Sequence, residues 1–176
     1  SGNGIRSDAI REVLKGELPE RDPHRLIWTS SPDRGLDVLL RIFKRAREFV
    51  ATFSLDIFYG WDRIDMIIAR ETNPRWSSLK TTILKLLDQP GVTWHGRVGQ
   101  GQLYQEILKS GMWVYPTSFS ETSCISVLEA QALGAIPVTI PYWALAYNVG
   151  HGIFIEGHAD REPRDPGERG VEHARV

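Results

Sequence analysis

The chain has 176 residues, a formal net charge of −1 and one cysteine, and 41 % of its residues are hydrophobic. These values are typical of a single globular domain with a real core, and one cysteine excludes an internal disulfide framework. The near-zero charge gives no general attraction to nucleic acid or to anionic membranes, and no apolar run reaches the roughly 20 residues of a membrane span. We therefore expect a cytoplasmic α/β domain, and Ser1 in place of a starting methionine suggests a piece of a longer protein.

The first half of the chain alternates helical patterns with short apolar runs. Apolar residues at Leu36, Leu39, Leu40 and Phe43 follow the i, i+3, i+4, i+7 spacing of one helix face. Gly16–His24 contains two prolines and is predicted to be a loop. The other elements expected here are a helix at Ala9–Lys15, strands at Leu26–Trp28, Phe49–Phe58 and Val92–Trp94, and helices at Asp62–Glu71 and Trp76–Leu87.

The second half continues the alternation. The expected elements are a helix at Leu103–Leu108, a strand at Met112–Tyr115, a helix at Thr122–Leu133 closed by Gly134, and strands at Ile136–Ile140 and Gly152–Ile155. Strands that alternate with helices predict a Rossmann-like, doubly wound parallel sheet within residues 1–156. Residues 157–176 are charged and nearly without apolar side chains, which predicts a flexible tail.

The loop after the first predicted strand is a candidate phosphate site. Ser30, Ser31 and Gly35 stand at a helix start, where free backbone N–H groups and the helix dipole attract anions. Arg34 adds a fork of donors that suits a phosphate. The alternative is that Ser31 or Asp33 only caps the helix and that Arg34 is solvated. The sequence has no G-x-G-x-x-G here, which argues against a nicotinamide-dependent oxidoreductase.

A second candidate lies around the helix predicted from Thr122. Thr122 and Ser123 are good N-cap residues, so the free amides of the helix start would lie just beyond Glu121. Glu129 falls on the face of this helix that should pack inward, where an unpaired carboxylate is costly. It would suit ribose hydroxyls, or alternatively pair with an Arg or Lys from a neighbouring element. Cys124 is interpreted as a small buried residue, since no base for a nucleophile is evident nearby.

The exit of the Val92–Trp94 strand is a third candidate. His95, Gly96 and Arg97 form a polar, flexible segment that would let a planar base approach the backbone. The alternative is an ordinary surface histidine. Trp143 is the tryptophan expected to border a site, and no Cys/His cluster has the spacing of a metal centre.

Several blocks of this sequence resemble the retaining glycosyltransferases of family 4, also called group 1. Glu121 and Glu129 form an E-x7-E pair, and Leu128–Val138 is similar to the LEAmA-G-PVv block of that family. Further blocks occur in the family's order: Asn3-Gly4-Ile5, Arg34-Gly35 and Tyr115-Pro116-Thr117. The resemblance covers roughly Asn3 to Ile155.

The resemblance implies the C-terminal, nucleotide-sugar-binding half of a two-domain GT-B enzyme, whose N-terminal acceptor domain this chain lacks. It makes Glu121 the catalytic contact to the transferred sugar, Glu129 the ligand of the ribose hydroxyls and Arg34 a phosphate ligand. The donor would be a UDP- or GDP-sugar, with no metal or other cofactor, and the parent protein could touch a membrane peripherally. The other implied donor-binding residues are the amides of Thr122, Ser123, Cys124 and Ile125, the base-side residues His95, Gly96 and Arg97, and Ser30, Ser31 and Gly35 of the first loop.

Two departures from the family pattern support an alternative function. Thr29-Ser30 stands where the family has Gly-Arg, so one phosphate-binding cation is missing. Thr122-Ser123-Cys124 stands where an FG pair commonly follows the first glutamate. The alternative is a non-catalytic nucleotide-sugar-binding or scaffolding domain of the same fold.

Overall fold

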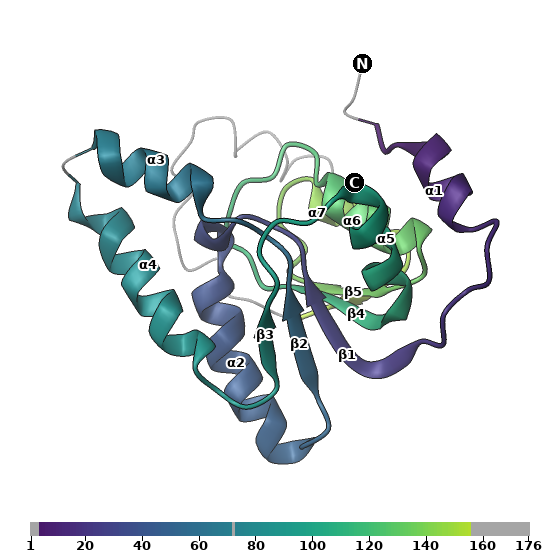
Figure 1. Ribbon diagram of the computed structural model, residues 1–176, viewed down its shortest axis with the longest axis horizontal. Coiled ribbons are helices and arrows are strands. Elements are labelled where there is room, and N and C mark those ends of the chain that lie inside the picture. The colour runs from purple at the N-terminus through teal and green to yellow at the C-terminus, as the bar shows by residue number, and fades with distance from the viewer. Residues whose placement is uncertain (1–3, 72, 156–176) are drawn as a thin grey trace, which may run out of the picture.

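The computed structural model describes residues 4–71 and 73–155. Its centre is a sheet with the strand order β3-β2-β1-β4-β5-β6, in which all neighbouring strands are parallel (Figure 1). The strands are β1 at Asp22–Trp28, β2 at Ser54–Ile57, β3 at Val92–Trp94, β4 at Ser110–Tyr115, β5 at Ile136–Thr139 and β6 at Ile153–Phe154. The predicted Rossmann-like parallel sheet is confirmed.

Helices connect the strands and cover the sheet. They are α1 at Ser7–Val13, η1 (a 3-10 turn) at Pro32–Arg34, α2 at Leu36–Phe49, α3 at Asp62–Arg70, α4 at Pro74–Leu87, α5 at Gln100–Lys109, α6 at Ile125–Ala132 and α7 at Leu145–Asn148. Figure 1 shows α2, α3 and α4 grouped on the left of the view, and α1, α5, α6 and α7 on the right. This grouping agrees with direct packing of α2 against α4 and of α1 against α5.

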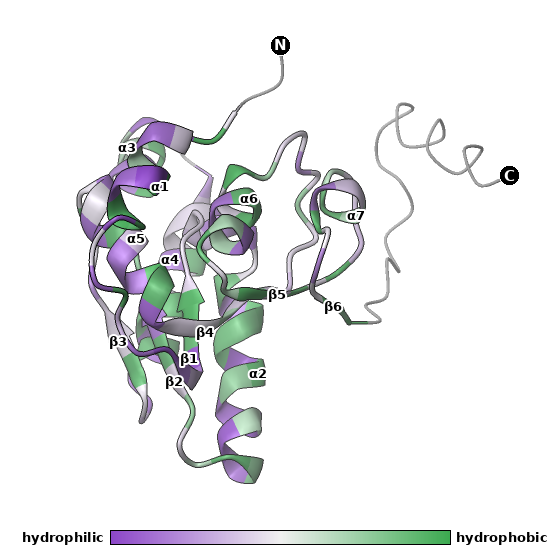
Figure 2. Ribbon diagram, turned by 90° about the vertical axis from the view of Figure 1, so that its right-hand side faces the viewer, coloured by the Kyte–Doolittle hydropathy of each residue, from purple (hydrophilic) through white to green (hydrophobic). Residues whose placement is uncertain are grey.

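The core forms where the predicted helix face meets the sheet. Leu36, Leu39, Leu40 and Phe43 are all buried, as their spacing predicts, and Figure 2 shows green and purple alternating along α2 as the ribbon turns. The largest buried side chains of the sheet include Trp28 and Trp113. Among the described residues, no helix has the length and apolar character needed to cross a membrane.

Several element boundaries differ from the prediction, two of them by many residues. The strand expected at Phe49–Phe58 is only Ser54–Ile57, because α2 continues through Phe49 and the chain then reverses. Arg47 stabilises that reversal by donating to the carbonyls of Ala51 and Phe53. The loop expected at Gly16–His24 ends earlier, since β1 begins at Asp22 and pairs there with β4. The predicted tail at 157–176 lies outside the described residues.

The strand order contains one topological switch point. From β1 the chain adds β2 and β3 on one side, and then crosses to add β4, β5 and β6 on the other. The loops that leave the carboxyl ends of β1 and β4 therefore start side by side at the centre of the sheet and lead to opposite sides of it. In open α/β sheets this crevice is where ligands bind.

Candidate functional site

The loops after β1 and β4 meet at the switch point. Gly35 has a φ of 105°, and a Cβ atom there would lie 2.9 Å from the backbone oxygen of Pro116. Only glycine suits both the backbone conformation and this close approach. The contact holds η1 and the start of α2 against the segment that leads to Glu121.

An ion pair joins these two loops. Nη1 of Arg34 donates to Oε1 of Glu121 at 2.7 Å, and the Tyr115 hydroxyl donates to the same oxygen at 2.6 Å. The Arg34 guanidinium also lies 4.3 Å from the centre of the Phe119 ring. Because Glu121 is only 5 % exposed, its carboxylate depends on these donors for compensation.

The surroundings of Arg34 favour its charged form. Burial by itself lowers the pKa of Arg34, but Glu121 and Tyr115 outweigh burial and raise that pKa above its ordinary value. Burial and the hydrogen bond to Glu121 also raise the pKa of Tyr115, which therefore stays a neutral hydrogen-bond donor. Arg34 Nε is buried and has no hydrogen-bond partner among the described residues.

The hydroxyl residues of the first loop face the protein interior. Ser30 is buried, and its carbonyl accepts a hydrogen bond of 2.6 Å from the indole of Trp28. Ser31 is also buried, and its hydroxyl contacts Asp33. Neither Ser31 nor Asp33 caps α2, whose N-cap is Gly35, and the alternative of a solvated Arg34 is wrong because Arg34 pairs with Glu121.

The helix expected from Thr122 begins three residues later. Its N-cap is Cys124, so the prediction that Thr122 or Ser123 caps it is wrong. The chain between Glu121 and Ile125 instead forms an irregular segment in which the Ile125 N–H donates to the Ser123 carbonyl at 3.1 Å. Burial raises the pKa of the Cys124 thiol to about 12, which agrees with its interpretation as a buried side chain rather than a nucleophile.

Glu129 points inward from α6, as its position on the helix predicts. It is 9 % exposed, and its Oε1 accepts from the Tyr104 hydroxyl at 2.6 Å and from the Gln100 amide at 3.1 Å. Both partners are neutral donors on α5, so these contacts do not include the Arg or Lys partner of the alternative interpretation. Burial raises the pKa of Glu129 despite the opposing hydrogen bond from Tyr104. The same hydrogen bond and burial raise the pKa of Tyr104 to about 12.

His95 lies at the end of β3 and belongs to a separate cluster. Its Nε2 contacts Oδ1 of Asp56 on β2, and its ring stacks on Phe58 with centroids 4.4 Å apart and planes 4° from parallel. Gly96 has a φ of 71°, which turns the chain sharply, and Arg97 lies 5.9 Å from the Tyr59 ring. The His95 side chain is thus partly exposed, but Phe58 packs on one face of its ring and Asp56 contacts one ring nitrogen. An ordinary surface histidine lacks such contacts.

The residues that bind the two glutamates were not predicted from the sequence. Tyr115 looks like a core residue because it ends a buried strand, and only the return of the loop brings it to Glu121. Gln100 and Tyr104 are four residues apart and share one face of α5, a spacing visible in the sequence. Trp143 has a φ of 50°, and the next residue donates its N–H to the Glu121 carbonyl at 3.0 Å. That strained backbone borders the site, where Trp143 was expected.

No ligand-binding role is assigned by these contacts alone. Glu121 of the first pair precedes α6, Glu129 lies within α6, and His95 contacts neither of these clusters directly. Within residues 4–71 and 73–155, no group of three or more His, Cys, Asp or Glu side chains is arranged to hold a metal ion. Arg34 follows the carboxyl end of β1, Glu121 follows that of β4, and His95 follows that of β3. Glu129 lies on α6, the helix that comes after β4.

Comparisons with known proteins show the class of fold. The sequence matches no protein-family model and no curated protein. The structure is similar to a UDP-forming α,α-trehalose-phosphate synthase from Burkholderia vietnamiensis, with a TM-score of 0.65 and 13 % identity over 87 % of this chain and 40 % of that one. It is also similar to a glycosyltransferase from Rickettsia africae, with a TM-score of 0.60 and 13 % identity over 97 % of this chain and 45 % of that one.

A third similar structure is the pneumococcal O-GlcNAc transferase GtfA, solved in complex with UDP and GlcNAc. Its TM-score is 0.58, with 18 % identity over 88 % of this chain and 28 % of that one. The chain therefore spans less than half the length of each of these solved chains. At such identities the similarity shows a Rossmann-like fold of the kind found in GT-B glycosyltransferases.

Proposed function

We propose that residues 4–155 bind the nucleotide-diphosphate-sugar donor of a retaining glycosyltransferase. The observation that carries this proposal is the Arg34–Glu121 pair, which stands at the switch point on the loops after β1 and β4. A cation beside a buried carboxylate suits such a donor, because the cation can bind the diphosphate and the carboxylate can accept hydrogen bonds from the sugar hydroxyls. The similarity to UDP-using and sugar-transferring proteins supports the same class.

Arg34 would bind the diphosphate without leaving Glu121. A guanidinium has five N–H donors, and Glu121 accepts from one of the two on Nη1. The other donors on Nη1 and Nη2 would be free to bind phosphate oxygens, whose negative charge grows as the bond to the sugar breaks, whereas Nε is buried. A fixed cation beside that charge stabilises the transition state more than the ground state, without a metal ion.

Glu121 and Glu129 would divide the rest of the donor between them. Glu121 would accept hydrogen bonds from the hydroxyls of the transferred sugar, held in place by Tyr115 and Arg34. Glu129 would accept from the ribose hydroxyls, which would relieve the cost of burying its charge. The amides of Thr122 to Ile125 would lie between these two contacts. Retention at the anomeric carbon and a second, acceptor-binding domain are part of this proposal.

Calorimetry with UDP and GDP tests the donor site. We expect one of them to bind, and we expect Glu129→Gln to raise the dissociation constant of that nucleotide about tenfold or more. The reason is that charge-assisted hydrogen bonds contribute about 1.5–3 kcal/mol. The matched control is Glu12→Gln on α1, which removes an exposed carboxylate paired only with Lys15. If neither nucleotide binds, or if both variants bind as the unchanged protein does, the proposal is wrong.

A second candidate is a non-catalytic binding or scaffolding domain of the same fold. The observation that favours it is that Arg34 already has its charge balanced by Glu121, while Ser30 occupies a buried position where the resembling family has a cation. Sugar transfer by a longer protein containing this domain decides between the two. Transfer that falls at least about 100-fold in Glu121→Gln excludes the non-catalytic role, whereas nucleotide binding without any transfer supports it.

A further inference from the structure

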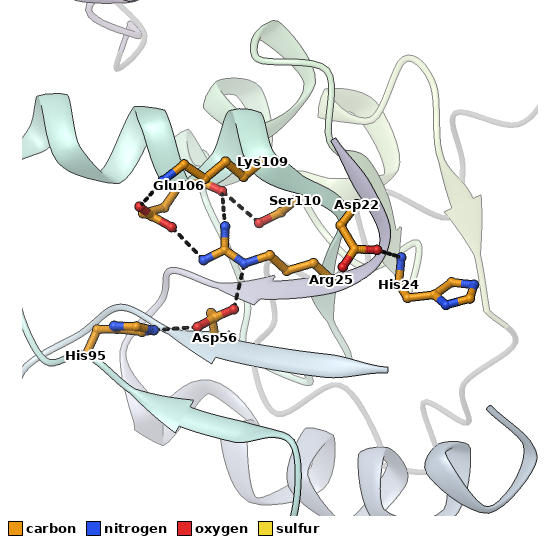
Figure 3. A network of polar contacts seen from close by, with 8 residues as sticks. All are labelled: Asp22, His24, Arg25, Asp56, His95, Glu106, Lys109 and Ser110. Atoms are coloured by element: carbon orange, nitrogen blue, oxygen red, sulfur yellow. Dashed lines mark hydrogen bonds and ion pairs between the residues drawn. The ribbon is translucent and has the colours of Figure 1, made fainter. Parts of the chain in front are cut away.

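A polar network crosses three neighbouring strands near the end of β3 (Figure 3). Nε of Arg25 on β1 donates to Oδ2 of Asp56 on β2 at 2.7 Å, and the other oxygen of Asp56 contacts Nε2 of His95. On α5, Glu106 accepts from Nη2 of Arg25 at 2.5 Å and is also paired with Lys109. The side chains of Arg25 and Asp56 are 14 % and 12 % exposed, so this is an inner network rather than a surface one.

The strand register explains why these residues meet. Ile27 pairs with Asp56, and Asp56 pairs with Thr93. Arg25 precedes Ile27 by two residues and His95 follows Thr93 by two, so both lie on the same face of the sheet as Asp56. The three side chains form a diagonal row that ends at the carboxyl edge of the sheet.

This row determines which nitrogen of His95 carries the proton. A carboxylate paired with an arginine only accepts hydrogen bonds, so the Nε2 of His95 donates to Asp56. In the neutral ring, Nδ1 is then an unprotonated acceptor. Because Phe58 covers one ring face, His95 offers to a ligand only its Nδ1 edge and its other face. The other charged groups around the row are Arg97 on the same loop and Glu106 and Lys109 on α5.

The row ends beside the candidate nucleotide site. His95 shares the carboxyl edge of the sheet with the loops that hold Arg34 and Glu121. The loop that His95 begins leads in five residues to Gln100, which donates to Glu129. A nucleotide that has its ribose at Glu129 therefore has its base within reach of this loop.

We propose that Arg25 and Asp56 are positioning residues that hold His95 with Nδ1 as an acceptor for an N–H group on the base of the donor nucleotide. This inference rests on the proposed function and adds a recognition residue to it. Uracil, through N3–H, and guanine, through N1–H, both carry a ring N–H on the Watson–Crick edge that could donate to this acceptor. Neither Arg25 nor Asp56 touches the ligand.

Asp56→Asn tests the positioning by changing one atom. The asparagine has one acceptor oxygen, and Arg25 beside it can only donate, so the oxygen stays with Arg25. The amide NH2 then faces His95 Nε2, which has to become the acceptor, and the proton moves to Nδ1. Long-range proton–nitrogen NMR spectra at about pH 8 distinguish the two tautomers.

We expect the Nε2–H tautomer in the unchanged protein and the Nδ1–H tautomer in Asp56→Asn. Glu106→Gln is the comparator, because it also disturbs the partners of Arg25 but leaves the Asp56–His95 contact in place. It should keep the Nε2–H tautomer. An Nδ1–H tautomer in the unchanged protein, or the same tautomer in all three proteins, overturns the proposal.

Binding measurements then test recognition of the base. The probes are UDP, GDP and ribose 5-diphosphate, which has no base. His95→Phe keeps a ring on Phe58 but has no acceptor. It should weaken binding of whichever of UDP and GDP binds more tightly by about tenfold, and leave the affinity for ribose 5-diphosphate unchanged. His95→Asn places an amide oxygen near the Nδ1 position and should restore part of the loss.

The two proposals fail in different ways. If the unchanged protein binds neither UDP nor GDP, the proposed function falls, and the base contact falls with it. If a nucleotide binds and Glu129→Gln weakens it, but His95→Phe binds it equally well, only the role of His95 is overturned. An equal loss for ribose 5-diphosphate also overturns it, since His95 would then support the loop rather than contact the base.

Discussion

Glu121 and Glu129 are both buried, but their surroundings differ in charge. Glu121 has a guanidinium at 2.7 Å, so its negative charge is balanced within the protein. Within residues 4–71 and 73–155, Glu129 accepts only from the hydroxyl of Tyr104 and the amide of Gln100, which stabilise a carboxylate less than a cation does. Glu129 therefore carries an electrostatic cost in the folded state that a ligand with hydroxyl donors would reduce. Residues that cost stability in the free protein are common at binding sites.

The pH dependence of stability reveals that cost. The pKa of Glu129 is higher in the folded state than in the unfolded state. Glu129 therefore adds to the free energy of unfolding below its unfolded-state pKa, and this stabilisation is lost as pH rises through its folded-state pKa. Glu129→Gln removes this dependence, so we expect the variant to gain stability relative to the unchanged protein between about pH 4 and pH 7. Urea unfolding at both pH values measures the difference.

Glu106 provides the control of opposite sign. Burial raises its pKa, but Lys109 and Arg25 outweigh burial and lower it overall. Glu106 therefore stabilises the folded state above its unfolded-state pKa, and this stabilisation is lost as pH falls through its folded-state pKa. Glu106→Gln should lower the free energy of unfolding by about 1 kcal/mol or more at pH 7, and by less at about pH 4. The same trend in both glutamine variants would contradict this account of the two environments.

The arrangement of the site depends on how two loops pack. The η1–α2 segment touches the segment after β4 only because Gly35 has no side chain. This contact brings Arg34 from the first segment to Glu121 from the second. Neither helix by itself creates the pair, since α2 starts two residues after Arg34 and α6 starts four residues after Glu121.

Gly35→Ala should disturb both stability and the ion pair. Its φ of 105° is strained for any residue with a Cβ, and that atom would lie 2.9 Å from the Pro116 oxygen. We expect a loss of about 1–3 kcal/mol in the free energy of unfolding, together with weaker UDP or GDP binding. Chemical unfolding and calorimetry measure the two effects.

Gly101→Ala is the matched control. A Cβ at Gly101 meets nothing within 4 Å, and the residue lies inside α5. The substitution should therefore stabilise the protein by up to about 0.5–1 kcal/mol. If Gly35→Ala were as stable as Gly101→Ala, the close approach of the two loops would not be what holds the site together.

Stability is distributed unevenly across the sheet. β1 lies between β2 and β4, and its residues Leu26 to Trp28 are buried. At the opposite extreme, β6 pairs through two residues, Ile153 and Phe154, which are 53 % and 44 % exposed. Few buried contacts and exposed backbone hydrogen bonds favour local opening. The candidate site lies near the well-packed centre rather than at this edge.

Hydrogen exchange tests this distribution. Amides of β1 and β4 should exchange only through global unfolding, whereas the Ile155 amide, bonded to the Thr139 carbonyl beside β6, should be at least about tenfold less protected. That difference corresponds to about 1.4 kcal/mol in opening free energy. Equal protection at Ile27 and Ile155 would show that the described part of the sheet opens as one unit.

Much of the fold follows from periodicity. The spacing of Leu36 to Phe43 predicts a helix with one buried face, and the strand at Val92–Trp94 has the predicted bounds. Gly134 has a φ of 81° just after α6, as a C-terminal cap requires. Element boundaries were predicted less accurately: Phe49 is apolar and aromatic, but it ends a helix and is 82 % exposed.

The candidate site was predictable only in part, and the reason is physical. The sequence alone determined the alternation of elements and the inward direction of Glu129, because both depend on residues a few positions apart. The tertiary structure decided the partners: Arg34 with Glu121 across 87 positions, Glu129 with Tyr104 across 25, and Asp56 between Arg25 and His95. Those pairings depend on strand order, register and the close approach at Gly35, which local spacing does not encode.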